Sequence, residues 1–197
     1  MSAGNSSMRQ HHRMPLSEYL LVAMPDEVVQ QKIVEEKEMF CLQYDHIRPA
    51  SGPSHLIIAS FLAKEMMEET LIRWIQNVCR LQQGFTVRLN NYNGIPEGMI
   101  YLRVQDPKQI HQLANALRII DGFLLSSECP PVSMINRPQL PIADGLPLAV
   151  YEKAIVEYAG KTFSESFKVE KLLLLKREAG YGAVEILNTF TLSPVAE

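Results

Sequence analysis

The feature that most constrains the fold is an internal match between two short segments. PSHLIIAS (53–60) and RPQLPIAD (137–144) have Leu, Ile and Ala at equivalent positions. Each segment precedes a predicted helix and then a pair of predicted strands, so the match is one of context as well as of letters. A duplicated unit of strands and helices explains both observations, and it predicts a groove shared by the two copies.

Apolar periodicity predicts the elements around these segments. Residues 17–25 read as a strand that Pro25 closes, and Asp26 is placed to cap the helix that follows. A helix over 64–83 has an apolar stripe made of Met67, Leu71, Trp74, Ile75 and Val78. Residues 53–61 read as a strand, and alternation predicts that His55, Ile57 and Ala59 share one of its faces. The remaining predictions are a hairpin of 85–94 and 98–105, helices at 106–120 and 148–160, a loop at 126–133, and a long hairpin of 166–178 with 183–192.

Composition limits the classes of partner. The chain has 197 residues, 47% hydrophobic and 21% charged, which is typical of a globular protein. We expect one bilobal domain over 17–197 behind a flexible tail at 1–16. The net charge of -3 provides no general attraction to DNA or to an anionic membrane. No signal-peptide pattern and no stretch of about 18 apolar residues is visible, which predicts a cytoplasmic protein.

Cysteine and histidine usage predicts neither disulfides nor a metal site. Cys41, Cys79 and Cys129 are far apart and odd in number, which favours small buried hydrophobic residues in a reducing compartment. His11 and His12 are adjacent in the polar tail. Adjacent histidines in a polar terminal segment more often belong to a mobile tail than to a metal site. We therefore expect no metal and no cofactor.

The chain resembles the two-histidine (2H) phosphoesterase superfamily, in particular its bacterial 2'-5' RNA ligase-like members. The resemblance extends from Tyr19 to Leu192 and rests on YLLVAMPDEV, PSHLIIASF, GMIYLRVQD, RPQLPIADGLP and FSESFKVEKLLLLKRE. It implies an α+β fold of two lobes related by a pseudo-twofold axis, with antiparallel sheets lining a central groove and helices outside. It also implies a nucleotide or an RNA terminus with a phosphate as partner.

The same resemblance implies a metal-independent chemistry. Each lobe of such proteins contributes a strand motif, His-x-Thr or His-x-Ser, whose side chains face the groove. Opening a 2',3'-cyclic phosphate, or forming a 2'-5' linkage, requires one group that accepts a proton and another that donates one. Imidazoles suit both roles near neutral pH, and the two hydroxyls hold phosphate oxygens.

This sequence departs from that pattern at three of its four positions. His55 is kept as the catalytic histidine, but Ile57 takes the place of the first hydroxyl residue. Gln139 takes the place of the second histidine, and Pro141 that of the second hydroxyl residue. Glutamine binds phosphate but exchanges no proton at neutral pH, and losing one general acid or base costs about 10²- to 10⁴-fold in rate.

Three hypotheses follow from these departures. The first is a catalytically impaired protein whose groove binds a nucleotide, an RNA end or another phosphate ligand. The second is an active cyclic phosphodiesterase or 2'-5' RNA ligase that uses His55 as its single acid/base, helped by Tyr101, Arg103 and Lys168 on polar strand faces. The third is a protein-interaction module that works outside the groove. The sequence sets no oligomeric state.

Overall fold

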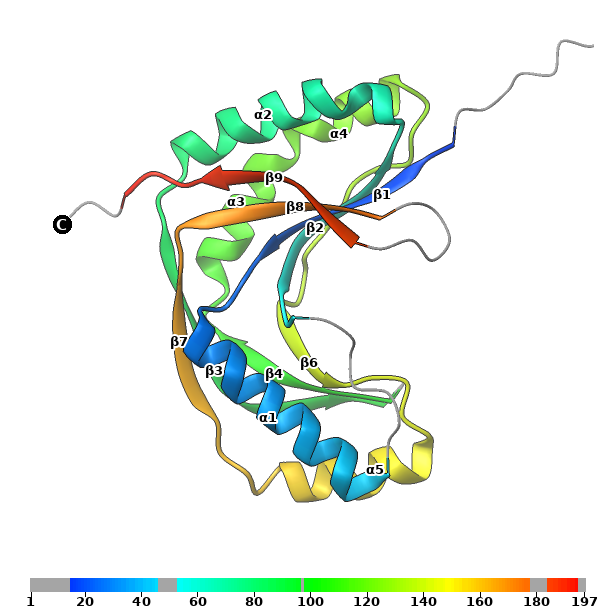
Figure 1. Cartoon of the computed structure of the whole chain (residues 1–197), viewed down its shortest axis with the longest axis vertical. Coiled ribbons are helices and arrows are strands. Elements are labelled where there is room, and N and C mark those ends of the chain that lie inside the picture. The colour runs from blue at the N-terminus through cyan, green and yellow to red at the C-terminus, as the bar shows by residue number, and fades with distance from the viewer. Residues whose placement is uncertain (1–14, 46–52, 97, 178–183, 195–197) are drawn as a thin grey trace, which may run out of the picture.

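Two antiparallel sheets form the centre of the protein (Figure 1). The computed structural model describes residues 15–45, 53–96, 98–177 and 184–194. The five-stranded sheet has the order β5 (Ser133–Met134), β2 (Leu56–Ala63), β1 (Ser17–Ala23), β8 (Lys171–Arg177) and β9 (Val184–Thr191). The four-stranded sheet has the order β6 (Gln139–Ala143), β4 (Met99–Gln105), β3 (Phe85–Ile95) and β7 (Ser164–Val169).

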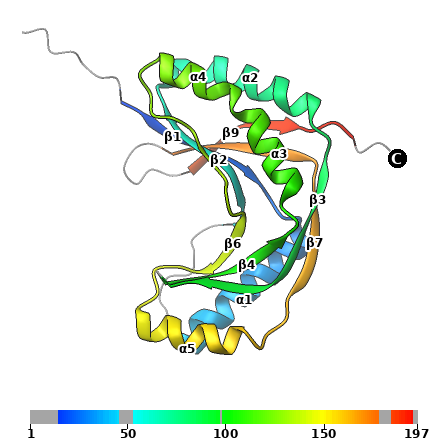
Figure 2. The ribbon, with the colours of Figure 1, turned by 180° about the vertical axis from the view of Figure 1, so that it is seen from behind.

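Helices cover one face of each sheet and leave the other face open. The five-stranded sheet is covered by α2 (Glu68–Leu81), α3 (Lys108–Leu117) and α4 (Ile119–Ser126), and a short 3-10 turn, η1 (Glu65–Met67), precedes α2. The four-stranded sheet is covered by α1 (Glu27–Tyr44) and α5 (Leu148–Tyr158), as the view from behind also shows (Figure 2). The predicted α+β fold of two lobes with helices outside is therefore confirmed.

Helix α1 belongs to one lobe by sequence and to the other by packing. It joins β1 to β2, which are neighbours in the five-stranded sheet, yet it lies against β6 and β7 of the four-stranded sheet. Its start is the predicted one, because the Asp26 side chain accepts a hydrogen bond from the Val29 N–H (3.0 Å). Helix α1 therefore packs against the lobe to which its neighbouring strands do not belong.

The predicted long strand 166–178 is wrong, because the chain changes sheets within it. Strand β7 pairs with β3 and ends at Val169, whereas β8 starts at Lys171 and pairs with β1 and β9. Glu170 lies between them, and its carbonyl accepts a hydrogen bond from the Leu192 N–H (2.9 Å). Apolar residues lie on both sides of Glu170, and the consecutive polar residues Glu170 and Lys171 interrupt their alternation without showing that the two halves pair in different sheets.

Two further predictions need correction. The helix predicted from 106 to 120 is interrupted at Arg118, whose N–H bonds the Asn115 carbonyl three residues back and so ends α3. A second helix, α4, then occupies residues up to Ser126. The β3–β4 hairpin is confirmed, but β3 continues through Gly94 and the turn lies further on, where the Gly98 N–H donates to the Ile95 carbonyl (3.0 Å).

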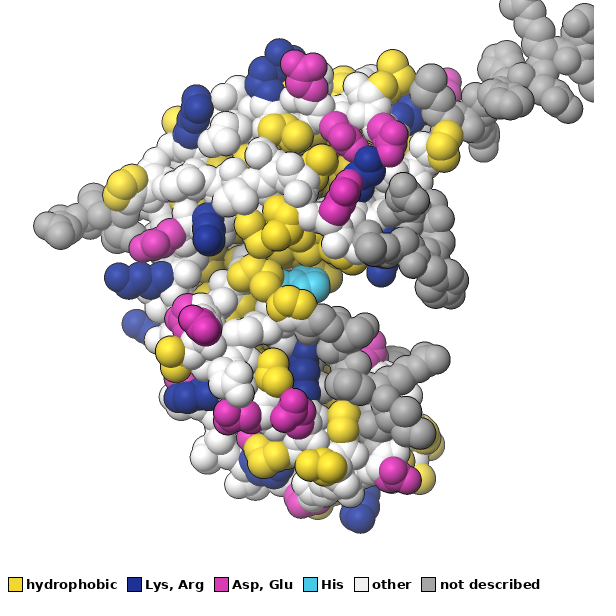
Figure 3. Space-filling view, viewed as in Figure 1, with side chains coloured by type: hydrophobic (Ala, Val, Ile, Leu, Met, Phe, Trp, Pro, Cys, Tyr) yellow, Lys and Arg dark blue, Asp and Glu magenta, His cyan; other side chains and the backbone are white. Residues whose placement is uncertain are grey.

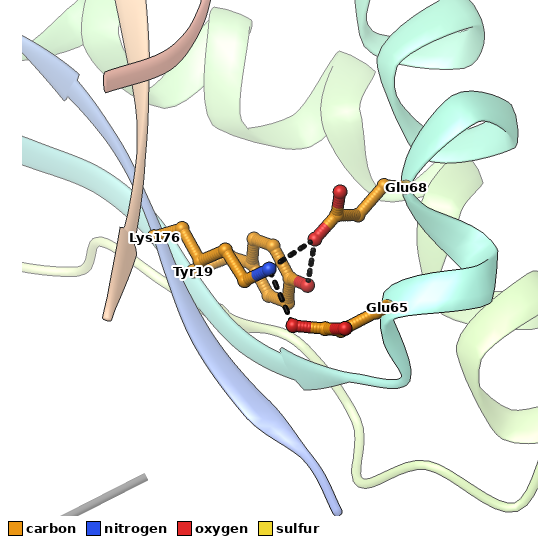
Figure 4. A network of polar contacts seen from close by, with 4 residues as sticks. All are labelled: Tyr19, Glu65, Glu68 and Lys176. Carbon is orange, nitrogen blue, oxygen red and sulfur yellow. Dashed lines mark hydrogen bonds and ion pairs between the residues drawn. The ribbon is translucent and has the colours of Figure 1, made fainter. Parts of the chain in front are cut away.

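A polar network fastens the helices to the covered side of the five-stranded sheet (Figure 4). The Tyr19 hydroxyl of β1 donates to Glu68 Oε1 at 2.7 Å. Lys176 of β8 contacts both Glu65 Oε1 (2.6 Å) and Glu68 Oε1 (2.9 Å). Burial, and next the bond to Glu68, raise the pKa of Tyr19, so this hydroxyl stays protonated. The network ties η1 and α2 to two neighbouring strands, on the side away from the groove.

Candidate functional site

The first motif lies where the chain enters β2. His55 immediately precedes the strand, between buried Ser54 and buried Leu56. Its Nδ1 is 3.1 Å from the Pro53 carbonyl oxygen, and because a carbonyl only accepts, Nδ1 carries the proton of this bond. Nε2 is consequently the ring nitrogen available to a ligand. Ile57, two residues on, is 36% exposed on the open face of the sheet.

A bulge changes the face assignment predicted for β2. Val22 pairs with Ile57 and the preceding Leu21 pairs with Ala59, so Ile58 is an extra residue in β2. One extra residue reverses the alternation beyond it. Ala59 is fully buried and Ser60 is partly exposed, so the prediction that Ala59 shares the face of His55 and Ile57 is wrong.

The second motif repeats this arrangement in β6. Tyr101 pairs with Pro141 and the preceding Ile100 pairs with Ala143, so Ile142 is the extra residue. The two bulges thus fall on equivalent residues of the two matching segments, Ile58 and Ile142. Because β6 is an edge strand and bulged at this point, it tolerates a proline that lacks the N–H donor. The internal match in the sequence therefore corresponds to a shared local backbone geometry.

The two motifs meet at one pocket between the lobes. The pocket has a volume of about 350 Å³, and four of the seven predicted site residues line it, namely His55, Ile57, Gln139 and Pro141. The Gln139 side-chain nitrogen lies 3.2 Å from the Met99 sulfur, which also lines the pocket. Figure 3 shows hydrophobic side chains gathered beside a histidine where the surface is hollowed between the lobes. The pocket thus places one imidazole and one amide together, with apolar side chains where the two hydroxyls were expected.

The other three predicted residues lie outside this pocket. Tyr101 and Arg103 are paired with Pro141 and Gln139 in the sheet, but they extend along the open face of β4 and do not line the pocket. Lys168 lines a separate cavity of about 460 Å³ beside the junction of β7 and β8, together with Thr86 and Glu170. The role of these three residues in assisting His55 stays a prediction.

Sequence reasoning missed Lys37, Ser54 and Arg137, which also line the pocket. A signal for Lys37 was present, because the buried residues of α1 are Val29, Ile33, Lys37 and Phe40. These positions follow the spacing of an apolar helical stripe, and a lysine within such a stripe is unusual. Burial lowers the pKa of Lys37 below the ordinary lysine value.

Other classes of site find little support in the described ranges. No three His, Cys, Asp or Glu side chains there converge as metal ligands would, and no helix there is long and apolar enough to span a membrane. Cys79 and Cys129 are buried as predicted, whereas Cys41 is partly exposed. His11 and His12 lie outside the described residues.

Comparison with solved structures shows which fold this is. The apo form of Escherichia coli LigT is 17% identical, with a TM-score of 0.62 over 90% of this chain and 98% of LigT. TT0787 of Thermus thermophilus is 17% identical, with a TM-score of 0.67 over 89% of this chain and 97% of TT0787. A third structure, described as a phosphoesterase, is 19% identical, with a TM-score of 0.61 over 91% of this chain and 99% of the other.

This chain has the 2H phosphoesterase fold. The match covers nearly the full length of each solved structure, so both lobes of the 2H fold are present. At these identities the likeness concerns the fold, and no protein-family model or curated protein matches the sequence.

Proposed function

We propose that this protein is a catalytically impaired, 2'-5' RNA ligase-like 2H phosphoesterase that binds the phosphate of a nucleotide or of an RNA end in the pocket between its lobes. The observation that carries the proposal is the composition of that pocket. His55 faces it together with Gln139, and Ile57 and Pro141 line it near them. Such a site can bind a phosphate, but it lacks the two proton-transferring groups that catalysis requires.

The chemistry of phosphodiester cleavage supports the impairment. One group has to remove a proton from the attacking hydroxyl while another protonates the leaving oxygen. His55 can perform one of these steps, but an amide at 139 performs neither at neutral pH. Ile57 and Pro141 offer no donor to the charge that develops on the phosphate oxygens, which adds to the loss.

The ligands found with LigT suggest which probes to use. LigT has been crystallised with 3'-AMP, with phosphate, with ATP and with NADP+. Each of these molecules contains a phosphate group. We propose that the present chain also binds a phosphate group. The two chains have the same fold, and His55 at the matching motif could bind an anion in the groove.

The deciding experiment measures both turnover and binding. We expect no turnover of 2',3'-cyclic AMP or of a 2'-5' linked dinucleotide above the rate of the His55→Ala variant. Calorimetric titration of the wild type with 3'-AMP should nevertheless give saturable binding. A clear rate that His55→Ala abolishes would contradict the impairment. Absence of binding by 3'-AMP and by inorganic phosphate would contradict the phosphate site.

One observation favours the active alternative. The bond from His55 Nδ1 to the Pro53 carbonyl orients the ring and leaves Nε2 available to a ligand, as a working acid/base requires. In that case the protein would be a cyclic phosphodiesterase or ligase with His55 as its single acid/base. The turnover assay above separates this alternative from the impaired one.

A further inference from the structure

We propose that Lys37 is the main anion-binding residue of the pocket and that it makes the pocket selective for the dianionic phosphate of a phosphomonoester over a cyclic phosphate or a diester. This inference rests on the proposed phosphate site and assigns its chemistry. The charge that holds the ligand would then come from helix α1, and not from the two strand motifs.

Lys37 is a nearly buried cation that forms no ion pair within the described part of the chain. It is 6% exposed, it lines the pocket, and it forms no hydrogen bond or ion pair with any residue of the described ranges. A buried ammonium that lacks a partner is unfavourable, which is why burial lowers its pKa. An anion in the pocket would supply the missing partner.

The remaining charged groups of the pocket also favour an anion. Arg137 and Asp144 line it together with Lys37, so two fixed cations face one carboxylate. His55 adds a ring nitrogen, Nε2, which can donate when the ring is protonated. The net charge of these side chains is therefore positive before a ligand enters the pocket.

Ser54 also lines the pocket and offers a second unpartnered polar group within the described residues. It is 5% exposed, and its Oγ has no hydrogen-bond partner among the described residues. Gln30 of α1 holds its backbone: in the amide orientation that satisfies both residues, the Gln30 nitrogen donates to the Ser54 carbonyl (3.0 Å) and its oxygen accepts from the Ser54 N–H (2.6 Å). Gln30 and Lys37 are seven residues apart on one helix, so α1 supports both polar groups.

Selectivity follows from charge. A phosphomonoester carries close to two negative charges at pH 7.5, since its second pKa is about 6, whereas a cyclic phosphate or a diester carries one. Ile57 and Pro141 stand where two neutral hydroxyl donors were expected, so Lys37 and Arg137 supply a larger share of the attraction to the ligand. Such attraction grows with the charge on the ligand.

The test compares 3'-AMP, inorganic phosphate and 2',3'-cyclic AMP by titration calorimetry at pH 7.5. In the wild type, 3'-AMP should bind about 10-fold more tightly than 2',3'-cyclic AMP. Lys37→Met should weaken 3'-AMP by about 10- to 100-fold, as loss of a charge-assisted hydrogen bond implies, and should remove the selectivity. Lys32→Met is the matched control, because Lys32 is on the same helix but pairs with Glu165 away from the pocket.

A second measurement separates binding from folding. Lys37→Met should raise the melting temperature of the free protein, because it removes a desolvated cation, and should abolish the further rise that 3'-AMP gives the wild type. If Lys37→Met fails to fold, Lys37→Gln takes its place. Equal binding of 3'-AMP by the wild type and the Lys37 variant overturns this inference and leaves the proposed function intact. No binding of 3'-AMP or phosphate by the wild type overturns both.

Discussion

The two sheets expose opposite kinds of surface on their open faces. Paired residues share a face, so the open face of the five-stranded sheet can be followed from Ile57 through Val22 to Leu173, and from Leu20 through Leu175 to Ile186. Val22 and Leu175 are buried within this face, whereas the other four residues are partly or fully exposed. The open face of the four-stranded sheet is polar and partly basic, and its exposed residues include Thr86, Arg88, Arg103, Gln105 and Lys168. A repeated backbone thus supports an apolar wall on one side and a polar wall on the other.

The two strand motifs share a local backbone geometry but differ in their chemistry. The bulges at Ile58 and Ile142 are equivalent, yet one motif holds an imidazole and the other an amide. A ligand with an apolar part and an anionic part suits two such walls better than a symmetric ligand does. A nucleotide has that division between its base and its phosphate.

The largest expected effect concerns whether the two lobes unfold together. Phe40 of α1 and Ile75 of α2 are both fully buried, under different sheets. Phe40→Ala should cost about 3–5 kcal/mol and Ile75→Ala about 2–5 kcal/mol of the free energy of unfolding. Because α1 and the β7–β8 junction interlock the lobes, each change should shift one common transition. Urea unfolding followed by Trp74 fluorescence and by far-ultraviolet circular dichroism should give coincident curves; two separated transitions would show independent lobes.

The next effect tests whether the amide motif still has the geometry of the imidazole motif. The double change Gln139→His with Pro141→Thr restores a proton-transferring group and a hydroxyl on β6. Turnover of 2',3'-cyclic AMP should rise by about 10²-fold or more, since a second acid/base becomes available. Adding His55→Ala to the double variant is the control and should remove the gain. A folded double variant without any gain would mean that the groove has lost the catalytic geometry as well as the residues.

A smaller effect compares one tyrosine hydroxyl from each lobe. Tyr19 donates to Glu68, whereas the buried Tyr158 hydroxyl has no hydrogen-bond partner among the described residues. Tyr19→Phe should cost about 1–3 kcal/mol, and Tyr158→Phe should be neutral or stabilise by about 1 kcal/mol. Chemical denaturation at pH 7 measures both. Equal losses from the two changes would contradict the assigned bonding.

The same pair predicts a pH dependence. Burial is the main cause that raises the pKa of both tyrosines in the folded protein above the ordinary value of 10.0. The unfolded chain therefore ionises first, so the free energy of unfolding does not change with these two groups below pH 10 and falls as pH rises from 10 toward the folded pKa. Each Phe variant should lose less stability than the wild type between pH 9 and 11, and a steeper loss would contradict the burial.

The sequence predicted the local structure of helices and strands better than it predicted which elements pack against each other. Asp26 as a helix cap, the stripe containing Leu71 and Ile75, and the hairpin of β3 and β4 depend on neighbours in the chain, and the structure has all three. The crossing of α1 to the other lobe and the change of sheet at Glu170 depend on contacts between distant residues. Amphipathic spacing identifies the buried face of a helix but does not identify what buries it.

The candidate site follows the same division. The internal match placed His55 and Gln139 on one groove, because each motif comes from an equivalent strand. The match could not find Lys37, since α1 reaches the pocket only through its crossing between lobes. The face of Ala59 was mistaken for a related reason, because nothing in the letters of β2 marks the bulge at Ile58.

The single-residue junction at Glu170 has a kinetic consequence. Strands β7 and β8 are each paired along their length, and the Glu170 carbonyl is bonded to Leu192. A rotation of the lobes about this junction would act on one residue and would strain the Glu170–Leu192 hydrogen bond, so we expect the width of the groove to be set before a ligand arrives. Association should then be a single diffusional step, with an observed rate that increases linearly with ligand concentration and shows no plateau.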